Sequence, residues 1–496
     1  MAIDPISVSD PAPSWFTPKW LLVFFCLINM INYIDRGAIS TNGVNGSPRS
    51  CTESNVCSDG SGIQGEFDLS NFKDGILSSA FLVGLLIASP IFASLAQSIN
   101  PFRLIGVGLS VWTLAVVGCG FSVDFWSITI CRMLVGVGEA SFIGLAAPFI
   151  DENAPVAQRT AWLGIFCMCL PIGIAVGDVY GGLVGDGLGW RYAFFGEAIL
   201  MLPFAILGFV MKPLQMKGMS NNIIPGFLNE ELSKKDFSSY VSFTSNLLSR
   251  FGQDMKALLS EKVYVVNVLG YISYNFVIGA YQYWSPKVIY GIYETENADL
   301  LFGGVIIVGG IVGTIGGSVL LDRMNSTIPN AFKLLSTAAF FGAIFCFSAF
   351  CFSSLYVFLA LFLIGVILIF AIQGPVNFVC LHAVKPSLRP LAMAISSVSI
   401  RIFGDVPSPP LFGILQDKVD NWRTSVWILN SILFLAAGIW FIGIFLPSVD
   451  RYEEDSEHLG TRVEQPDVTP FLESKMADGD TTSAVYKGKG KTKRLL

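Results

Sequence analysis

The chain contains Gly177-Asp178-Val179 followed by Trp190-Arg191 in its first half, and Gly404-Asp405-Val406 followed by Trp422-Arg423 in its second. An arginine precedes each copy at nearly the same offset. Each copy lies between long apolar runs, so the repeat indicates a membrane protein and not a stack of small soluble units. Two related halves of this kind are typical of transporters.

The composition agrees with a protein that spans a bilayer. Of 496 residues, 53% are apolar and 14% are charged, far from the average of soluble proteins. Runs of about 20 apolar residues are long enough to cross the hydrocarbon as helices. Twelve such spans are predicted, at about 18–40, 75–97, 101–121, 125–150, 160–183, 191–211, 263–289, 300–321, 331–353, 355–382, 390–415 and 424–446.

These spans divide the chain into five regions. Two sets of six helices, 18–211 and 263–446, are separated by a linker, 212–262, in which apolar residues recur at helical spacing, as in an amphipathic helix. The first region, 1–17, carries no recognisable cleavable signal. The tail, 447–496, has too few apolar residues to fold alone and is predicted to be disordered.

Basic residues are distributed unevenly over the predicted loops. Most of them lie on the side that also carries both termini and the linker. The opposite side holds only Arg49, Lys73, Arg191, Lys287, Lys418 and Arg423. Because positive loops stay in the cytosol, both termini are predicted to be cytosolic.

The first loop on the non-cytosolic side contains two cysteines, Cys51 and Cys57, which can form a disulfide in an oxidising compartment. Two unpaired thiols are an equally good interpretation, because the sequence does not give their geometry. Asn45-Gly46-Ser47 in the same loop is a glycosylation sequon, and Pro48 directly after it disfavours its use.

Charged residues inside the predicted spans are the candidate functional residues, because ionisable groups in hydrocarbon are costly and usually face water or each other. The first span contains Asn32-Tyr33-Ile34-Asp35-Arg36, and the fourth carries Arg132 and Glu139 on one helical face. At about 1.5 Å per residue, Asp35 and Arg132 lie at nearly equal depth. We predict that they pair and leave Arg36 and Glu139 for a ligand or a proton. The alternative is that these charges only anchor helix ends.

The repeat places Asp178 and Asp405 at equivalent positions in the two halves. Arg401 and Asp405 are four residues apart and can form a pair within one helix. Prolines at 407, 409 and 410 interrupt that helix, and broken helices are where transporters bend and bind. A structural kink without ligand contact explains the prolines equally well.

Spans 7 and 10 carry further polar residues, which either line a cavity or join helices through hydrogen bonds. They are Asn267, Tyr271, Tyr274, Asn275, Gln373 and Asn377. Glycines of span 8 recur at four-residue spacing, which favours close helix packing.

With these motifs the sequence resembles the Spinster family of the major facilitator superfamily. The resemblance rests on 32–36, on the run from Arg132 to Ser141 that ends Gly-Glu-Ala-Ser, and on 403–409. It implies an all-α membrane protein with twelve transmembrane helices in two pseudo-symmetric six-helix bundles and alternating access. It also implies export of lysophospholipids or sphingolipids such as sphingosine 1-phosphate, with plant-type members in late endosomes and lysosomes. The plasma membrane is an alternative location.

The chain departs from the superfamily pattern between spans 2 and 3. The usual charged loop motif is replaced there by Ala93-Ser94-Leu95-Ala96-Gln97-Ser98, whereas the second half keeps Asp322 and Arg323. Gating through this motif is therefore expected to involve Asp322 and Arg323 alone, and the strength of proton coupling is left open.

The residue chemistry suits a phosphate-bearing amphiphile, because Arg36 or Arg132 can hold a phosphate through forked hydrogen bonds. A sugar or organic-anion carrier could use the same arginines, and a lipid receptor that does not transport is a further alternative. An enzyme is not predicted, because the two histidines have no metal-binding spacing and no phosphate-binding loop is present. The expected partners are the bilayer and a lipid substrate, with protons as a further candidate. No cofactor, metal or nucleic acid is expected, and a monomer is the expected form.

Overall fold

The computed structural model describes residues 18–51, 57–95, 101–153, 159–210, 253–295, 298–385 and 388–446. These belong to one compact unit, 1–448, and the tail predicted to be disordered lies outside the described residues. Almost all regular structure is helical. Two short strands, β1 (Ser50–Cys51) and β2 (Cys57–Ser58), form an antiparallel pair.

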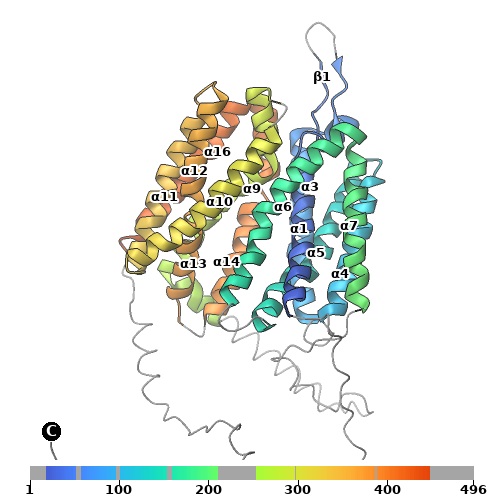
Figure 1. Cartoon of the computed structure of the whole chain (residues 1–496). Helices are drawn as coiled ribbons and strands as arrows, with labels where there is room; N and C mark the ends of the chain where they lie inside the picture. The colour runs from blue at the N-terminus through green and yellow to red at the C-terminus, as the bar shows by residue number, and fades with distance from the viewer. Residues whose placement is uncertain are drawn as a thin grey trace, which may run out of the picture. The chain divides into compact units, whose positions relative to one another are not determined.

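The first half contains six long helices and one short one. They are α1 (Pro18–Ala38), α2 (Gly62–Glu66), α3 (Asn71–Leu95), α4 (Pro101–Gly120), α5 (Phe125–Asn153), α6 (Arg159–Leu188) and α7 (Trp190–Val210). In Figure 1 they form the blue-to-green group. The long helices coincide with the first six predicted spans, so the apolar runs locate them correctly.

The second half repeats this plan with more breaks. Its elements are α9 (Lys262–Tyr293), α10 (Ala298–Arg323), α11 (Ile328–Ala349), α12 (Leu355–Phe370), α13 (Gln373–His382), α14 (Arg389–Ile400), η3 (Arg401–Asp405), α15 (Ser408–Val419) and α16 (Trp422–Gly443). In the described part of the chain, 11 stretches are long and apolar enough to cross a membrane, and Leu355–His382 is one of them. The eleventh predicted span, 390–415, is divided among α14, η3 and α15.

The division of this span has a local cause. In η3 the backbone N–H of Val406 donates to the carbonyl oxygen of Arg401 at 2.9 Å, which is the five-residue step of a π-helix. Pro407 follows and cannot donate, and α15 begins with prolines in its first turn, where no N–H is needed. The predicted helix break is therefore confirmed.

The sequence repeat is also a structural repeat. The paired arginines and tryptophans open equivalent helices: Arg159 begins α6 and Arg389 begins α14, while α7 and α16 each begin with tryptophan. The paired glycines pack equivalently. A Cβ on Gly177 would lie 2.3 Å from the carbonyl oxygen of Ile34 on α1, and one on Gly404 would lie 3.1 Å from Asn275 Cβ on α9. Each glycine thus allows its helix to approach the first helix of its own half closely.

The two halves contact each other at the end of the bundle that carries β1, β2 and α2, here called the hairpin end (Figure 1). The Asp417 carboxylate on α15 accepts hydrogen bonds from the Asn71 amide side chain at 2.8 Å and from the Phe72 backbone at 3.0 Å. At a second contact between the halves, a Cβ on Gly303 of α10 would lie 3.0 Å from the Cβ of Ala175 on α6. The hairpin end is therefore closed in this conformation.

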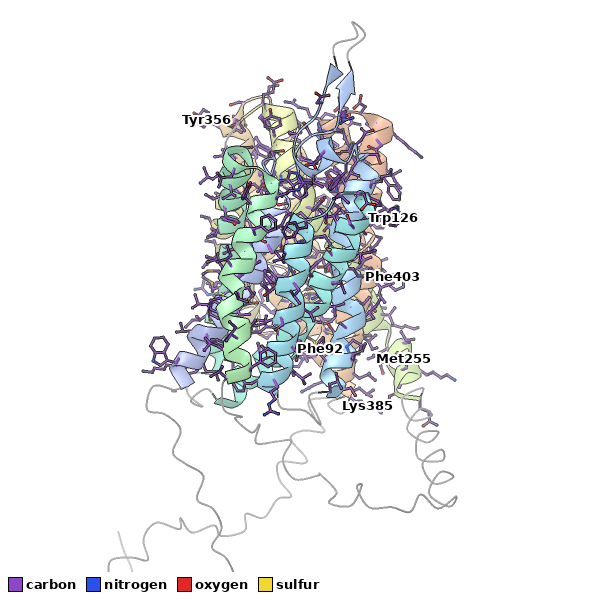
Figure 2. All side chains as sticks on the ribbon, turned by 90° about the vertical axis from the view of Figure 1, so that its right-hand side faces the viewer. Phe92, Trp126, Met255, Tyr356, Lys385 and Phe403 are labelled. Carbon is purple, nitrogen blue, oxygen red and sulfur yellow. The ribbon has the colours of Figure 1, made fainter. Side chains whose placement is uncertain are left out.

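Many large apolar side chains face outward, as expected for surfaces that contact lipid. Figure 2 shows Trp126 and Tyr356 toward the hairpin end, Phe403 midway and Lys385 at the opposite end. Trp126 and Tyr356 are 67% and 83% exposed. Exposed Trp and Tyr near one end are typical of a membrane–water boundary.

Candidate functional site

Two buried charges join α1 to α5. The Arg132 Nη1 atom lies 2.7 Å from Asp35 Oδ1, with side chains 1% and 0% exposed. Equal depth on neighbouring helices predicted this pair, and the contact confirms it. A guanidinium in this position needs such a partner, because an isolated buried charge costs several kcal/mol.

Arg36 and Glu139 form a second ion pair between the same two helices. The prediction that pairing of Asp35 with Arg132 would leave both free is wrong. Arg132 and Glu139 lie two turns apart on one face of α5, so both face α1, where Asp35 and Arg36 are neighbours. The depths of these residues along their helices could not by themselves reveal this second ion pair.

The two ion pairs differ in their exposure to solvent. The Glu139 side chain is fully buried, whereas the Arg36 side chain is 20% exposed. The guanidinium carbon of Arg36 lies 4.8 Å from the centre of the Tyr33 ring and 4.7 Å from that of Phe81. Two aromatic faces thus hold a cation that one ligand oxygen could still reach.

Two buried polar side chains lie close to these pairs on α1 and α7. Asn32 is fully buried, and neither atom of its amide has a hydrogen-bond partner among the described residues. Glu197 on α7 is also fully buried and has Asp35 and Arg132 as electrostatic neighbours. Glu197 was not predicted as a functional residue. It is the one acidic residue of the sixth predicted span, and an acid inside a span is a signal of function.

Asp178 lies where α6 meets α1 and α10. Its carboxylate accepts a 3.4 Å hydrogen bond from Ser40 at the end of the first span. A Cβ on Gly303 of α10 would approach its other oxygen to 3.3 Å. Asp178 therefore lies at the contact between the halves formed by α6 and α10.

In the second half, Arg401 and Asp405 do not form the predicted ion pair within the described residues. The prediction assumed α-helical geometry, whereas the backbone between them is the π-turn η3. Arg401 is still an electrostatic neighbour of Asp405, and each also interacts with the first half: Arg401 with Glu139, and Asp405 with Arg36. The charged residues of both halves thus share one region.

A second buried network, which the sequence analysis missed, connects the halves at the hairpin end. Asp74 on α3 accepts hydrogen bonds from Lys287 Nζ at 2.7 Å, Tyr283 Oη at 2.7 Å and Asn45 Nδ2 at 3.1 Å. Gln64 accepts a further hydrogen bond from Lys287. We call these five residues the hairpin-end lock.

The lock corrects the sequence interpretation of Lys287 and agrees with that of the Asn45 sequon, whose use Pro48 already disfavoured. Lys287 was assigned to a loop, yet it belongs to α9 and its side chain is only 4% exposed, so it does not count toward loop charge. Asn45 is fully buried and donates to both Asp74 and Tyr283. A glycan on Asn45 has no room in this conformation.

Four of the six polar residues of spans 7 and 10 bond helix to helix, whereas Asn275 and Asn377 donate to carbonyl oxygens of their own helices. Asn267 donates to the Val376 carbonyl at 3.0 Å, and Gln373 bonds Tyr271 and Tyr274 at 3.2 Å each. This favours the packing interpretation over cavity lining. The glycines of span 8 pack closely too, since a Cβ on Gly313 would lie 2.3 Å from the Ile367 carbonyl oxygen.

The remaining predicted residues lie at the two ends of the bundle. Asp322 and Arg323 end α10, and Asp322 accepts a 3.1 Å hydrogen bond from Ser326. Their first-half counterparts, 96–100, lie outside the described residues. Cys51 is the register partner of Cys57 in the hairpin, although the side chains of both lie outside the described residues. Of the amphipathic linker, 253–262 is described, and 253–260 is helical.

The charged interior and the fold are those of a membrane transporter and not of an enzyme. The model of the Major Facilitator Superfamily matches residues 25–404. Within the described residues, no group of three or more His, Cys, Asp or Glu could hold a metal ion.

Proteins of similar sequence identify the family within this superfamily of transporters. "Probable sphingolipid transporter spinster homolog 2" of Arabidopsis thaliana is 64% identical over 467 residues, covering 92% of this chain and 93% of the relative. "Probable sphingolipid transporter spinster homolog 1" of the same plant is 58% identical over 451 residues, covering 89% and 92%. This chain belongs to the Spinster family of the major facilitator superfamily.

Solved structures share the fold at lower identity. A bacterial homolog of the human lysosomal transporter Spinster, inward-facing and unoccupied, matches with a TM-score of 0.69 at 16% identity, over 87% of this chain and 98% of that chain. A D-xylose–proton symporter matches with a TM-score of 0.64 at 18% identity, over 86% and 98%.

Proposed function

We propose that the protein exports lysophospholipids or sphingolipids that carry a phosphate, such as sphingosine 1-phosphate, by proton-coupled alternating access. Arg36 carries this proposal. It is the one partly exposed cation of the two α1–α5 ion pairs, and two aromatic rings flank it. The Arabidopsis relatives are named as sphingolipid transporters.

The phosphate is assigned to Arg36 because Arg132 is too buried to meet a ligand without breaking its pair with Asp35. A phosphate offers forked acceptors that match a guanidinium. It would displace Glu139 from Arg36, and Arg401 of the other half is already an electrostatic neighbour of Glu139. Two arginines, one from each half, could thus close on one headgroup.

The positions of the contacts between the two halves support alternating access. Contacts between α3 and α15, contacts between α6 and α10, and the hairpin-end lock all close the hairpin end. Export requires that this end open while the opposite end closes. The break at η3 supplies an element that can bend during this exchange.

The predicted orientation places the hairpin end outside the cytosol and both termini inside it. With Lys287 inside α9, fewer basic loop residues remain at the hairpin end. We assign the protein to late endosomal or lysosomal membranes, with the plasma membrane as the alternative. The solved bacterial relative is described as a homolog of a lysosomal transporter.

The test is flux through purified, full-length protein in sealed vesicles. Labelled sphingosine 1-phosphate, sphingosine, lysophosphatidylcholine and xylose are compared, each with and without a pH gradient. We expect transport of the phosphate-bearing lipids, faster with the gradient, and no transport of xylose. Transport of xylose alone would support the sugar-carrier alternative, and saturable lipid binding without flux would support the receptor.

A further inference from the structure

Glu197 has no partner that can balance its charge if it is ionised. Its side chain is fully buried, and neither carboxylate oxygen has a hydrogen-bond donor among the described residues. Arg132 is an electrostatic neighbour of Glu197, but its Nη1 donates to Asp35 and no hydrogen bond joins it to Glu197 among the described residues. A buried ionised carboxylate without a donor costs several kcal/mol.

Another carboxylate, Asp35 on the packed helix α1, is an electrostatic neighbour of Glu197. The second oxygen of Asp35, Oδ2, likewise has no donor. Two ionised carboxylates repel, and both are acceptors only, so they cannot bond each other. They can bond when one of them carries a proton, as in other carboxyl pairs that share a site.

The charge count of the α1, α5 and α7 cluster leads to the same result. Arg36 and Arg132 supply two positive charges, and Asp35, Glu139 and Glu197 supply three negative charges when ionised. One proton on the cluster makes it neutral. Neutrality is the favoured state in an interior of low dielectric constant.

Other titratable groups around Glu197 do not supply the missing positive charge. Tyr180 of α6 faces Glu197 but donates its hydroxyl to the Ala193 carbonyl oxygen at 2.7 Å. From α4, Cys119 has Arg132 and Asp35 as neighbours and is neutral as a thiol. The charged residue of α4, Arg103, lies near its first turn, far along the helix from Cys119.

We propose that Asp35 and Glu197 share one proton in this conformation and that this pair is the proton site of the transporter. The proposal deepens the proposed function, since it rests on proton coupling. Loss of the proton leaves two carboxylates beside Arg132, which then bridges α1 and α7 in place of holding Asp35 alone. A phosphate on Arg36 that frees Glu139 adds another negative charge nearby, so substrate binding and protonation favour each other.

Infrared spectroscopy tests the site without any substrate. A protonated carboxyl absorbs where ionised carboxylates do not, so the full-length protein in lipid nanodiscs is measured from acid to neutral pH. We expect a protonated-carboxyl band that persists at neutral pH in the parent protein and is lost in Glu197→Gln. Glu66→Gln, which removes an exposed carboxylate at the hairpin end, is the matched control and should keep the band. A band that persists unchanged in Glu197→Gln overturns the proposal.

Flux measurements separate this proposal from the proposed function. In vesicles, Glu197→Gln should lose the pH dependence of sphingosine 1-phosphate transport, while Glu197→Asp should retain a pH dependence with a displaced midpoint. If the parent protein moves no lipid, the proposed function fails and the infrared band still decides the proton site. If lipid is transported and Glu197→Gln keeps both band and pH dependence, only the proton assignment fails. Should Glu197→Gln not fold, Glu197→Asp carries both measurements, and an unchanged band position together with an unchanged midpoint overturns the assignment.

Discussion

At the residue scale, adjacent charges in one sequence motif have different surroundings. Asp35 pairs with Arg132 in full burial, while Arg36 pairs with Glu139 and keeps one-fifth of its surface exposed. Burial makes the Asp35–Arg132 pair a condition for folding, because removal of one partner leaves the other uncompensated. Exposure leaves Arg36 able to meet a ligand.

We therefore expect Arg132→Gln to destabilise the protein by about 3–5 kcal/mol, the usual cost of breaking a buried ion pair. Thermal unfolding in detergent measures this. Adding Asp35→Asn should restore most of the loss, since no unpaired charge remains between the two positions. Equal melting temperatures for Arg132→Gln and the parent protein would contradict the pairing.

Arg36→Gln should behave differently from Arg132→Gln. Because Arg36 is partly exposed, we expect a smaller loss of stability but at least a tenfold weaker binding of sphingosine 1-phosphate, since one charged hydrogen bond contributes about 1.5–3 kcal/mol. Binding of sphingosine, which lacks the phosphate, should change little. If Arg36→Gln weakens the binding of both lipids equally, the headgroup lies elsewhere.

The ion pair between Glu66 and Arg191 predicts an acid sensitivity. Arg191 lies 2.6 Å from both carboxylate oxygens of Glu66, and its hydrogen bonds lower the pKa of Glu66 below the ordinary value. A lowered carboxyl pKa in the folded state stabilises the protein above the unfolded value, about 4.3, and this stability is lost as the pH falls through the lowered pKa. Both side chains are partly exposed, so the effect is at most about 1 kcal/mol.

The measurement is the difference in melting temperature between the parent protein and Glu66→Gln. It should favour the parent protein at neutral pH and shrink below about pH 4, within the limits of a surface pair. The same variant made in an Arg191→Gln background is the control and should show no pH-dependent difference. A constant difference across this range would contradict the assignment.

At the scale of elements, η3 joins α14 to α15 and carries Arg401 and Asp405 between them. Its π-turn and the prolines after it weaken the backbone ladder, so bending there is cheap. Asp405, the last residue of η3, has Arg36 as an electrostatic neighbour in the other half. We expect Asp405→Asn to slow turnover more than it weakens substrate binding, as judged from transport rate and equilibrium binding. Equal loss of both would indicate damage to folding or direct substrate contact.

The hairpin-end lock joins α3 to α9 through buried charges, so it should hold that end closed. The neutral pair Asp74→Asn with Lys287→Met removes the ion pair without leaving a lone charge. We expect this double variant to open the hairpin end more often. A cysteine at Ser79, which lies beyond the lock and donates to the Val406 carbonyl oxygen, should then react faster with an impermeant thiol reagent added from the hairpin side. The same cysteine in the parent protein is the control, and equal rates would show that the lock does not limit opening.

At the scale of the whole molecule, much of the fold follows from the sequence, because 11 of the predicted spans are membrane-length helical stretches in the described residues and the other, 390–415, is helical but interrupted. Depth along the helices was enough to predict the pairing of Asp35 with Arg132. The pair of Arg36 with Glu139 and the position of Glu197 depend on helix rotation and on which helices touch, which apolar periodicity does not fix. Lys287 was misplaced for a different reason. It falls near the end of the predicted span 263–289 and was counted with the loop charges, whereas α9 extends to Tyr293 and Lys287 is buried within it.

If transport requires the two ends of the bundle to open in turn, a cross-link that holds the hairpin end closed should stop transport. Ala175 on α6 and Gly303 on α10 are suitable for cysteine substitution, since a Cβ on Gly303 would lie 3.0 Å from Ala175 Cβ, near the spacing of a disulfide. We expect oxidation of Ala175→Cys with Gly303→Cys to abolish lipid flux, and reduction to restore it. The matched control joins two helices of the same half: a Cβ on Gly309 would lie 3.1 Å from Val366 Cβ, so Gly309→Cys with Val366→Cys links α10 to α12. That cross-link leaves the halves free to move against each other and should preserve transport. Undiminished flux through the fully oxidised α6–α10 pair would exclude separation of the halves at the hairpin end as a step of transport.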